Sequence, residues 1–306
     1  MVSHSERFLR SQGSWFYRTT MNDADCVAFL QWALPRMRLA WAGFRNVRRT
    51  VCRRVDRRFR ALGLGDIAAY RAHLAAMPSE WEELRSLCSI PISRFYRDRQ
   101  VFESLEHMVL PELATAAIRR GDPTLECWSA GCASGEEPYT LSILWQLKLS
   151  ARYSSRLQLR VLATDIDPSL LERAVAACYR LSALKELPVS WRGEAFEQRA
   201  GEYCVRAPFR APVRIAHQDI CTTMPDQLFD LILCRNVVFT YFAPELQDEL
   251  AQRLIDRLRP GGALVLGLHE CFPSGISSVV RWPGTRAIVR RVVPSASPSN
   301  PAAEAR

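Results

Sequence analysis

After about residue 90 the sequence alternates between short apolar runs and helical segments, and this alternation restricts the possible fold more than any other feature. Predicted strands cover residues 125–129, 159–164, 213–216, 229–234 and 263–268, and predicted helices cover 134–149, 168–177 and 244–258. Strands that alternate with helices are typical of a parallel sheet with helices on both faces. The predicted fold class is therefore α/β, with a doubly wound, Rossmann-like sheet.

The segment before residue 90 shows helical patterns only. "DADCVAFLQWAL" begins at Asp23 with acidic residues that favour a helix start, and Pro35 ends or kinks this helix. Farther along, apolar residues recur three or four positions apart, as on one face of a helix: Phe44, Val47, Val51, Val55, Phe59 and Leu62. "DIAAYRAHLAAM" and "SEWEELRSLCS" predict two shorter helices. These patterns indicate an N-terminal all-α domain.

The domain boundaries follow from these changes of pattern. Residues 1–20 lack periodicity and are interpreted as a loose leader, and 21–90 form the helical domain. Residues 91–293 form the α/β domain, which includes an irregular stretch at about 180–212 with a small predicted hairpin. The tail, 294–306, is rich in Pro, Ser and Ala and is predicted to be disordered.

Composition favours a cytoplasmic protein. No apolar run approaches the roughly 18–20 residues of a membrane span, and the N-terminus has no apolar core typical of a secretory signal. The ten cysteines lie singly, without a C-x-x-C pair. We interpret them as reduced thiols packed in the core, and we expect no metal site.

The stretch "LECWSAGCASGEEPYTLSILW", residues 125–145, places a glycine turn between a strand and a helix. Gly131 and Gly135 allow a tight turn and a close approach of the backbone to a ligand. Ser134 followed three residues later by Glu137 matches a capping box, which is a purely structural interpretation of that glutamate. Glu136 is not needed for such a cap.

The two glutamates argue against phosphate ligands. No lysine follows Gly135, as a phosphate-binding loop requires, and the glycines do not have the G-x-G-x-x-G spacing. Adjacent carboxylates at a helix start would also repel a diphosphate. A positively charged ligand without phosphate fits better, and S-adenosylmethionine is such a ligand. "LATDIDP" supplies Asp165 and Asp167 at the end of the next strand, where an acceptor for ribose hydroxyls belongs.

Six motifs together resemble the CheR-type chemotaxis protein methyltransferases: "SRFYRD", "WSAGCASGEEPYTLSI", "ATDID", "YRLSALKEL", "CRNVVFTYF" and "LRPGGALVLGLHE". The resemblance runs from about Asp23 to Leu268. It implies a class I methyltransferase sheet with an N-terminal helical domain and a small inserted β-subdomain. It also implies an enzyme that uses S-adenosylmethionine, yields S-adenosylhomocysteine, and methylates glutamate side chains of chemoreceptors.

The resemblance assigns roles to residues that match the family's motifs. Glu136 would contact the amino-acid end of the cofactor, Asp165 its ribose, and Asp219 with Ile220 its adenine side. Gly131 provides the close backbone approach. The other cofactor contacts implied lie at the mouth of the pocket and in the loop over it: Arg235, Asn236, Ser93 and Arg97.

Arg97 and Tyr241 are the catalytic candidates implied. A substrate glutamate is already ionised near neutral pH, so it needs no general base. An arginine and a tyrosine hydroxyl can hold its carboxylate beside the methyl group. The alternative for Arg97 is a surface ion pair with Asp98 or its neighbours.

The sequence departs from the family's pattern at several places. "CRNVVFTYF" has one extra residue before Tyr241, so either a bulge restores the direction of the tyrosine or its role is lost. Pro91 replaces an asparagine that contacts the cofactor in many relatives. "GLHE" replaces "GHSE", and we expect no catalytic role for His269 or Glu270. The short β-subdomain is not expected to tether a receptor's C-terminal peptide.

The net charge of +9 comes almost wholly from arginine, and arginines crowd the polar face of the helix around residues 45–58. This face has three interpretations: a solvated surface, a docking surface for acidic receptor helices, and a nucleic-acid surface. Docking is favoured, with Arg45, Arg48, Arg49 and Arg53 as its residues, because no RNA-binding module is recognisable. We expect a monomer that neither binds nucleic acid nor enters the membrane.

Two alternatives to a receptor methyltransferase stay open. One is a methyltransferase with a non-receptor substrate such as RNA. The other is a cofactor-binding regulator or scaffold without catalysis, which Pro91 and the insertion before Tyr241 make plausible.

Overall fold

A computed structural model describes residues 22–153 and 155–292. The chain divides into two compact units. The first comprises Met1–Ala33 and Asn46–Cys88, and the second comprises Leu34–Arg45 and Ser89–Arg306. The leader and the C-terminal tail predicted from the sequence lie outside the described residues.

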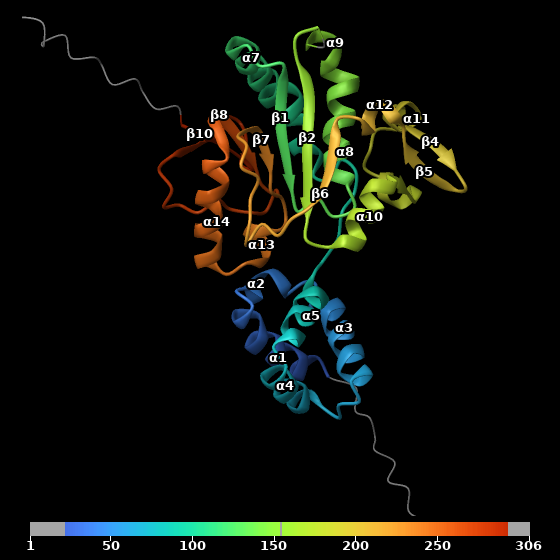
Figure 1. Ribbon diagram of the computed structural model, residues 1–306, viewed down its shortest axis with the longest axis vertical. Coiled ribbons are helices and arrows are strands. Elements are labelled where there is room, and N and C mark those ends of the chain that lie inside the picture. The colour runs from blue at the N-terminus through green and yellow to red at the C-terminus, as the bar shows by residue number, and fades with distance from the viewer. Residues whose placement is uncertain (1–21, 154, 293–306) are drawn as a thin grey trace, which may run out of the picture. The chain divides into compact units, whose positions relative to one another are not determined.

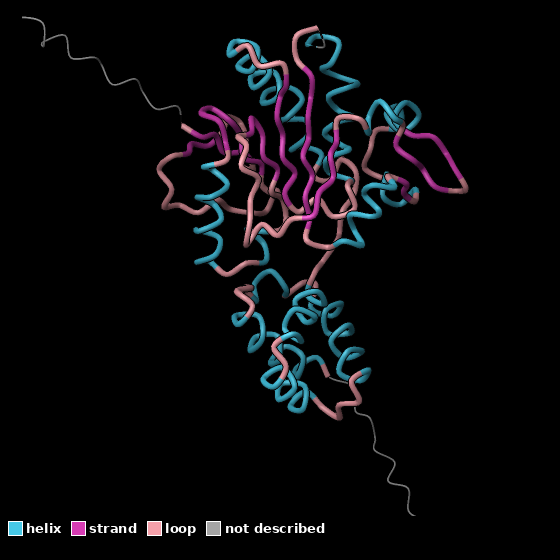
Figure 2. The backbone as a smooth tube through the Cα atoms, viewed as in Figure 1, coloured by secondary structure: helices cyan, strands magenta, loops and turns pink. Residues whose placement is uncertain are grey.

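The described residues of the first unit form helices joined by loops (Figure 2). Its helices are α1 (Asp23–Arg36), α3 (Arg48–Ala61), α4 (Ile67–Ala76) and α5 (Ser79–Cys88). The long helix predicted around residues 44–62 is two helices, because α2 (Trp41–Phe44) ends before α3 begins. The apolar face predicted for α3 is nevertheless correct, since Val51, Val55 and Phe59 are buried.

A buried carboxylate joins three helices of this unit. Glu80 of α5 is only 5% exposed, and its oxygens accept hydrogen bonds from Arg58 of α3 at 2.7 Å and from the Tyr70 hydroxyl of α4 at 2.8 Å. The hydrogen bond from the Arg58 guanidinium lowers the pKa of Glu80 below its usual range. The ionised form therefore stabilises the folded unit.

Glu80→Gln is expected to lower the free energy of unfolding by about 1–2 kcal/mol at neutral pH, because a charged hydrogen-bond acceptor is lost. A carboxyl whose folded pKa is depressed stabilises above its unfolded pKa, here about 4.3, and loses that contribution as pH falls through the folded value. Urea denaturation at pH 7 and at pH 3–4 checks this. A difference between variant and wild type that does not shrink in acid would contradict it.

All the strands of the described residues, and most of their helices, belong to the second unit (Figure 1). Its helices before the small sheet are α2, α6 (Arg99–Ser104), η1 (Leu105–Val109), α7 (Leu110–Arg120), α8 (Glu136–Leu144), η2 (Trp145–Leu149), α9 (Ser150–Tyr153) and α10 (Pro168–Ala176). The later ones are η3 (Leu181–Leu184), α11 (Val189–Ala195), α12 (Ala207–Arg210), α13 (Val238–Tyr241) and α14 (Pro244–Asp256). No helix within the described ranges has the length and apolarity needed to cross a membrane.

Seven strands form the main sheet in the order β6-β2-β1-β7-β8-β10-β9. They are β1 (Thr124–Ala130), β2 (Gln158–Asp165), β6 (Val213–His217), β7 (Phe229–Leu233), β8 (Leu258–Val265), β9 (Val279–Arg281) and β10 (Ile288–Arg291). The five predicted strands pair in parallel, and β10 and β9 add antiparallel at one edge. The α/β class is confirmed.

Alternate residues of each central strand enter opposite cores. Leu125 and Cys127 of β1 belong to a core shared with α7 and α8, whereas Trp128 and Ala130 belong to a core shared with α14. This division is the two-sided burial that near-continuous apolar strands predict. The carboxyl ends of the parallel strands consequently meet along one edge of the sheet.

A second sheet of three strands, in the order β3-β5-β4, follows α10. Its strands are β3 (Cys178–Tyr179), β4 (Phe196–Arg199) and β5 (Glu202–Val205). The hairpin predicted near residue 203 is thus present, and β3 extends it. We equate this sheet with the small β-subdomain.

The interpretation of all cysteines as free thiols is wrong. Cys178 of β3 and Cys204 of β5 lie opposite each other and form a disulfide, and Cys26 and Cys52 form another. Both pairs are 26 residues apart in the sequence, so no short spacing marks them. Each pair is brought together only by the folding of its unit.

Peptide mapping without reductant is expected to recover both disulfide-linked peptides. Reduction should lower the free energy of unfolding by about 2–3 kcal/mol per bond, because each bond closes a loop of moderate length. Alkylation before and after reduction, followed by mass spectrometry, measures the pairing. Complete alkylation of all four cysteines in the unreduced, unfolded chain would contradict it.

Candidate functional site

The glycine turn after β1 is shaped by close contacts. Gly131 has φ +79°, and a Cβ atom there would lie 2.7 Å from a methyl of Val237, which follows β7. Gly135 has φ +91°, and a Cβ atom would lie 3.0 Å from the Tyr139 ring. Both glycines are therefore required by backbone conformation and by space. The turn also donates two N–H groups, those of Gly131 and Cys132, to the carbonyl of Thr164 at the end of β2.

Glu136 is the first residue of α8 and is only 3% exposed. Burial raises the pKa of its carboxyl, and a hydrogen bond from Ser93 partly offsets this effect. Among the described residues, none hydrogen-bonds to the buried Oε2 atom of Glu136. A buried carboxylate oxygen without a donor is a site for a positively charged or hydroxylated ligand.

Glu137 has a different role from the one that a capping box implies. Gly135 is the N-cap residue of α8, and no side chain caps this helix. The Glu137 carboxylate instead accepts a hydrogen bond from Ser129 at 2.8 Å and pairs with Arg235 at 3.1 Å. The capping-box interpretation is wrong, because Glu137 points into the sheet and is used for an ion pair.

Asp165 ends β2 and supports the glycine turn. Its carboxylate accepts the N–H of Ala133 at 2.8 Å and the N–H of Asp167 at 3.0 Å. Burial raises the pKa of Asp165, and these backbone donors oppose the rise. Asp167 itself caps α10 by accepting from Ser169 at 2.9 Å. Asp165 thus ends the strand, as predicted, and also supports the glycine turn, whereas Asp167 is a helix cap.

Asp219 and Ile220 follow β6, one strand farther along the same edge of the sheet. The Asp219 carboxylate accepts the N–H of Cys221 at 2.8 Å. Ile220 packs partly buried against the core shared with α14. Both residues therefore occupy the carboxyl end of a parallel strand, where ligands of such sheets bind.

Arg235 is buried rather than exposed at the mouth of a pocket. Its side chain is 2% exposed and pairs with Asp98 at 2.7 Å and with Glu137. It also donates to the carbonyl of Arg97 and lies over the Phe102 ring at 5.2 Å. The guanidinium therefore fastens the Arg97 loop to α8 and to the end of β7.

Arg97 and Asn236 are neighbours. The Arg97 guanidinium donates to the Ile92 carbonyl at 2.7 Å and to Asn236 Oδ1 at 3.3 Å. Within the described residues Arg97 forms no ion pair with Asp98, whose carboxylate pairs with Arg235 instead. Asn236 has φ 57°, a left-handed conformation that asparagine tolerates better than most residues. Phe95 and Tyr96 are buried and anchor this loop.

Tyr241 ends α13, a single helical turn that follows β7. Burial raises the pKa of its hydroxyl, and the nearby charge of Arg97 opposes this rise. The hydroxyl is therefore protonated at neutral pH and can donate. Its ring packs against Phe44, with centroids 5.1 Å apart, and its carbonyl accepts the N–H of Ala40 at 2.8 Å. The contribution of the segment Leu34–Arg45 was not predictable from its sequence, because its apolar residues do not indicate which element they contact.

The predicted site residues of the second unit thus gather at the carboxyl ends of β1, β2, β6 and β7. Each of these residues ends one of the strands, follows one of them, or belongs to the loop before α6. They are Ser93, Arg97, Gly131, Glu136, Asp165, Asp219, Ile220, Arg235, Asn236 and Tyr241. The docking candidates of α3 belong to the first unit, and Arg45 ends the Leu34–Arg45 segment of the second.

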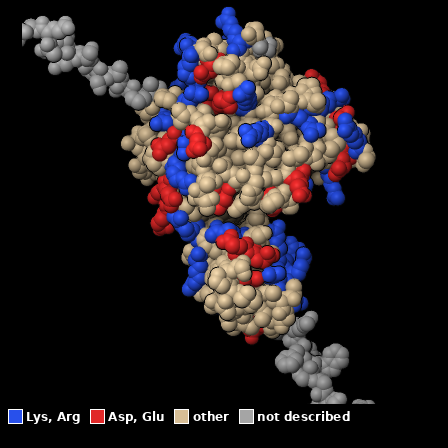
Figure 3. All heavy atoms as spheres, viewed as in Figure 1, with Lys and Arg blue, Asp and Glu red and all other residues tan. Residues whose placement is uncertain are grey.

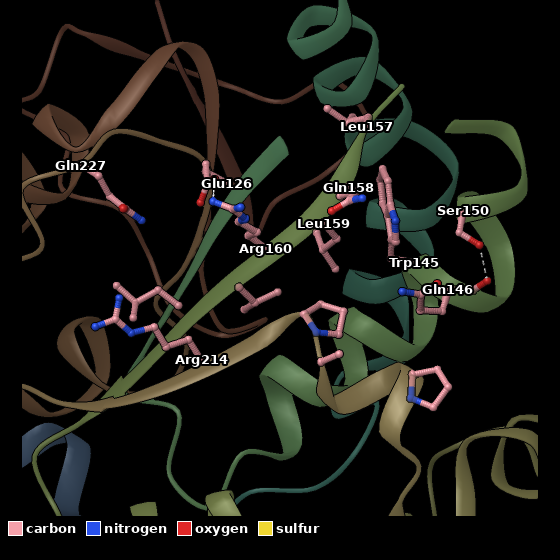
Figure 4. Close-up of a pocket in the computed structure, with 15 residues that line it drawn as sticks. Glu126, Trp145, Gln146, Ser150, Leu157, Gln158, Leu159, Arg160, Arg214 and Gln227 are labelled. Carbon is pink, nitrogen blue, oxygen red and sulfur yellow. Dashed lines mark hydrogen bonds and ion pairs between the residues drawn. The ribbon is translucent and has the colours of Figure 1, made fainter. Parts of the chain in front are cut away.

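A separate groove of about 650 Å³ lies at the opposite, amino-terminal end of β2 and β6 (Figure 4). Trp145, Arg160 and Arg214 are among its lining residues, and none of the predicted site residues is. In open α/β sheets the ligand binds outside the carboxyl ends of the strands. The candidate site is therefore the constellation around Glu136 and not this groove.

Comparison with known proteins identifies the family. The model of the CheR methyltransferase S-adenosylmethionine-binding domain matches residues 92–286. A chemotaxis protein methyltransferase of Listeria innocua is 37% identical over 62% of this chain and 68% of its own length. The chemotaxis protein methyltransferase of Salmonella typhimurium is 30% identical over 83% of this chain and 86% of its own. An uncharacterized 104.1 kDa protein of Rhodobacter capsulatus is 34% identical over 73% of this chain, which spans only 23% of that protein. The chain belongs to the CheR methyltransferase family.

Proposed function

We propose that this chain transfers a methyl group from S-adenosylmethionine to glutamate side chains of a chemoreceptor-like protein. The observation that carries the proposal is the buried Glu136 carboxylate near the carboxyl end of β1, whose Oε2 atom accepts no hydrogen bond from any described residue. Membership of the CheR methyltransferase family supports it, and so do the relatives that are named chemotaxis protein methyltransferases.

The residues present fit the methyl donor. Glu136 offers a buried anion for its ammonium group, and Ser93 lies beside that carboxylate. Asp165 ends β2 and Asp219 follows the neighbouring strand β6. Their carboxylates can accept hydrogen bonds from hydroxyl and amino groups of the ligand. Gly131 and Gly135 give the turn its positive φ angles and leave room for the side chains of Val237 and Tyr139, which pack against it. When bound, S-adenosylmethionine supplies a methyl group on a positively charged sulfur.

The chain's own work at the substrate is binding and orientation. A glutamate is ionised near neutral pH, so no residue needs to remove a proton. The Arg97 guanidinium is fixed through Ile92 and Asn236, and the protonated Tyr241 hydroxyl lies within its electrostatic reach. We assign these two groups to holding the substrate carboxylate in line and excluding water around it.

The arginines of α3 are proposed to bind acidic helices of the substrate. Arg49, Arg53 and Arg57 are exposed and four residues apart, so they form a stripe along one side of the helix. None of the three has an ion pair with another described residue, whereas Arg48 pairs with Asp23 and Arg58 with Glu80. Figure 3 shows basic side chains gathered along this flank of the helical unit. Of the predicted docking residues, Arg49 and Arg53 are therefore the available ones.

The test is methyl transfer from methyl-labelled S-adenosylmethionine to receptor fragments with acidic helices. We expect the fragments to take up label that mild alkali releases as methanol. Fragments whose glutamates have been changed to glutamine should take up none. Replacement of Arg49, Arg53 and Arg57 by glutamate should raise KM roughly tenfold or more, since three favourable charges become unfavourable. Arg160 is an exposed arginine of the second unit, so Arg160→Glu is the matched control and should leave KM unchanged.

Two results would replace the proposal. Alkali-stable label in RNA, with none in receptor fragments, would assign the activity to a nucleic-acid substrate. Tight binding of S-adenosylhomocysteine without turnover on any acidic fragment would indicate a regulator that binds the cofactor. Location in the cytoplasm and a monomeric state are parts of the proposal that fractionation and sedimentation would check.

A further inference from the structure

A buried carboxylate just after β8 joins two loops that the proposed reaction depends on. Glu270 is 8% exposed. Its Oε2 atom accepts the N–H of Gly267 at 2.6 Å and the N–H of Asn236 at 2.9 Å. Its Oε1 atom accepts the hydroxyl of Thr240 at 2.5 Å. One side chain therefore satisfies donors from the loop after β8, the loop after β7 and α13.

The contact with Asn236 fixes a conformation that the chain would not otherwise favour. Asn236 has φ 57°, and its N–H depends on Glu270 for a partner at 2.9 Å. A Cβ atom at Gly267 would lie 2.8 Å from Asn236 Oδ1 and 2.9 Å from Glu270 Oε2. The loops are packed so closely that residue 267 has to be glycine. Asn236 Oδ1 is in turn the acceptor for Arg97, so the position of Glu270 determines where the guanidinium is held.

The contact with Thr240 fixes α13 from one side. On the other side a Cβ atom at Gly43 would lie only 2.1 Å from the Thr240 carbonyl oxygen. The Ala40 N–H donates to the carbonyl of Tyr241, the next residue along. The helical turn that carries Tyr241 is thus held between Glu270 and the segment 40–43. A shift of the Glu270 carboxylate would break the hydrogen bond from Thr240 and leave α13 held by the segment 40–43 alone.

We propose that Glu270 is a positioning residue, which sets Arg97 through Asn236 and Tyr241 through Thr240. The inference rests on the proposed function for its catalytic consequence, and it assigns to Glu270 no contact with substrate or cofactor. A carboxylate suits this place because its two oxygens can accept three hydrogen bonds at once.

Glutamine distinguishes geometry from charge at this position. Its amide oxygen can accept from Gly267 and Asn236, and its NH₂ group can donate to the Thr240 oxygen, so Glu270→Gln preserves the connections. Glu270→Ala removes all three. If position is what matters, kcat of Glu270→Ala should fall on the order of 10²-fold, the loss that a misplacement of about 1 Å produces. Glu270→Gln should stay within a few-fold of the wild type.

Two further measurements separate this inference from the proposed function. Calorimetry with S-adenosylhomocysteine should show weaker binding for Glu270→Ala than for Glu270→Gln, because Asn236 is among the proposed cofactor contacts. Amide exchange should be faster in peptides covering 234–242 and 266–271 of Glu270→Ala. Both readouts exist even if the wild type methylates no receptor fragment, in which case only the proposed function fails.

Thr240→Val and Thr240→Ser keep the test decisive if Glu270→Ala does not fold. Valine replaces only the hydroxyl, with a methyl group, so kcat of Thr240→Val should fall while its affinity for S-adenosylhomocysteine is unchanged. Serine keeps the hydroxyl, so Thr240→Ser should have a kcat close to that of the wild type. Equal damage from Glu270→Gln and Glu270→Ala would overturn the inference in favour of a requirement for charge. Wild-type kcat and affinity in both Glu270→Ala and Thr240→Val would overturn it altogether.

Discussion

Arg235→Met is expected to lower the free energy of unfolding by about 3–5 kcal/mol, the usual cost of removing one partner from a buried ion pair. The guanidinium is 2% exposed and is paired with two carboxylates, those of Asp98 and Glu137. Methionine fills most of the space but leaves the carboxylate of Glu137 buried without its cation. The loss should appear as a lower midpoint in urea denaturation.

The pH dependence of this loss has a definite sign. Burial raises the pKa of Glu137, and the charge of Arg235 is the first factor that opposes the rise. Without Arg235 the pKa rises further, so the ionised carboxyl destabilises the variant above the unfolded pKa of about 4.3. The difference from wild type should therefore be larger at pH 8 than at pH 5, where Glu137 is more readily protonated.

An exposed ion pair supplies the control. Arg38 and Glu249 are separated by 2.8 Å, but their side chains are 55% and 44% exposed. Arg38→Met should cost less than about 1 kcal/mol, because water screens the pair. Adding Glu137→Gln to Arg235→Met should recover part of the loss. Equal costs for the Arg235 and Arg38 variants would contradict the structural role assigned to Arg235.

Arg97→Lys is expected to reduce kcat on the order of 10²-fold, the effect of removing one preorganised donor from a site. Arg97 uses two nitrogens of a planar fork to reach the Ile92 carbonyl and Asn236 Oδ1. A lysine ammonium keeps the charge but cannot make both contacts in that geometry. The proposed hold on the substrate carboxylate would loosen while the fold is retained.

Arg94→Lys is the matched control for that substitution. Arg94 is in the same loop, 53% exposed, and pairs with Glu186 at 3.0 Å. Its replacement should leave kcat unchanged, as measured by initial rates at saturating substrate. A catalytic rate of Arg97→Lys equal to that of the Arg94 variant would remove Arg97 from the proposed machinery.

The parallel strands and the glycine turn were predictable because their signals are local. Strand β1, the turn at Gly131 and Gly135, and the start of α8 are all specified within residues 124–144. The strand β2 with Asp165 is likewise local, and parallel pairing then places their carboxyl ends together. Motif order was sufficient to bring the candidate residues to one edge of the sheet.

Other features depend on contacts between distant segments and left no local signal. The antiparallel strands β9 and β10 are short and exposed in part, so their pattern is weak. Glu137 matched a capping box by spacing, but Arg235, 98 residues away, determines its role. The disulfides and the contact of Gly43 with Thr240 likewise require the folded chain. Glu270 was visible in "GLHE", but its three donors could not be known from the sequence.

Calorimetric titration with S-adenosylhomocysteine tests the central claim most directly, namely that Glu136 and Asp165 belong to a cofactor site. The wild type, a Glu136→Gln, Asp165→Asn double variant and Glu126→Gln would be compared. Glu126 is the matched control, a partly buried carboxylate of β1 that is bonded to Thr124 at 2.7 Å. We predict binding by the wild type and Glu126→Gln and loss of binding in the double variant. No binding by the wild type, or equal binding by the double variant, would contradict the account.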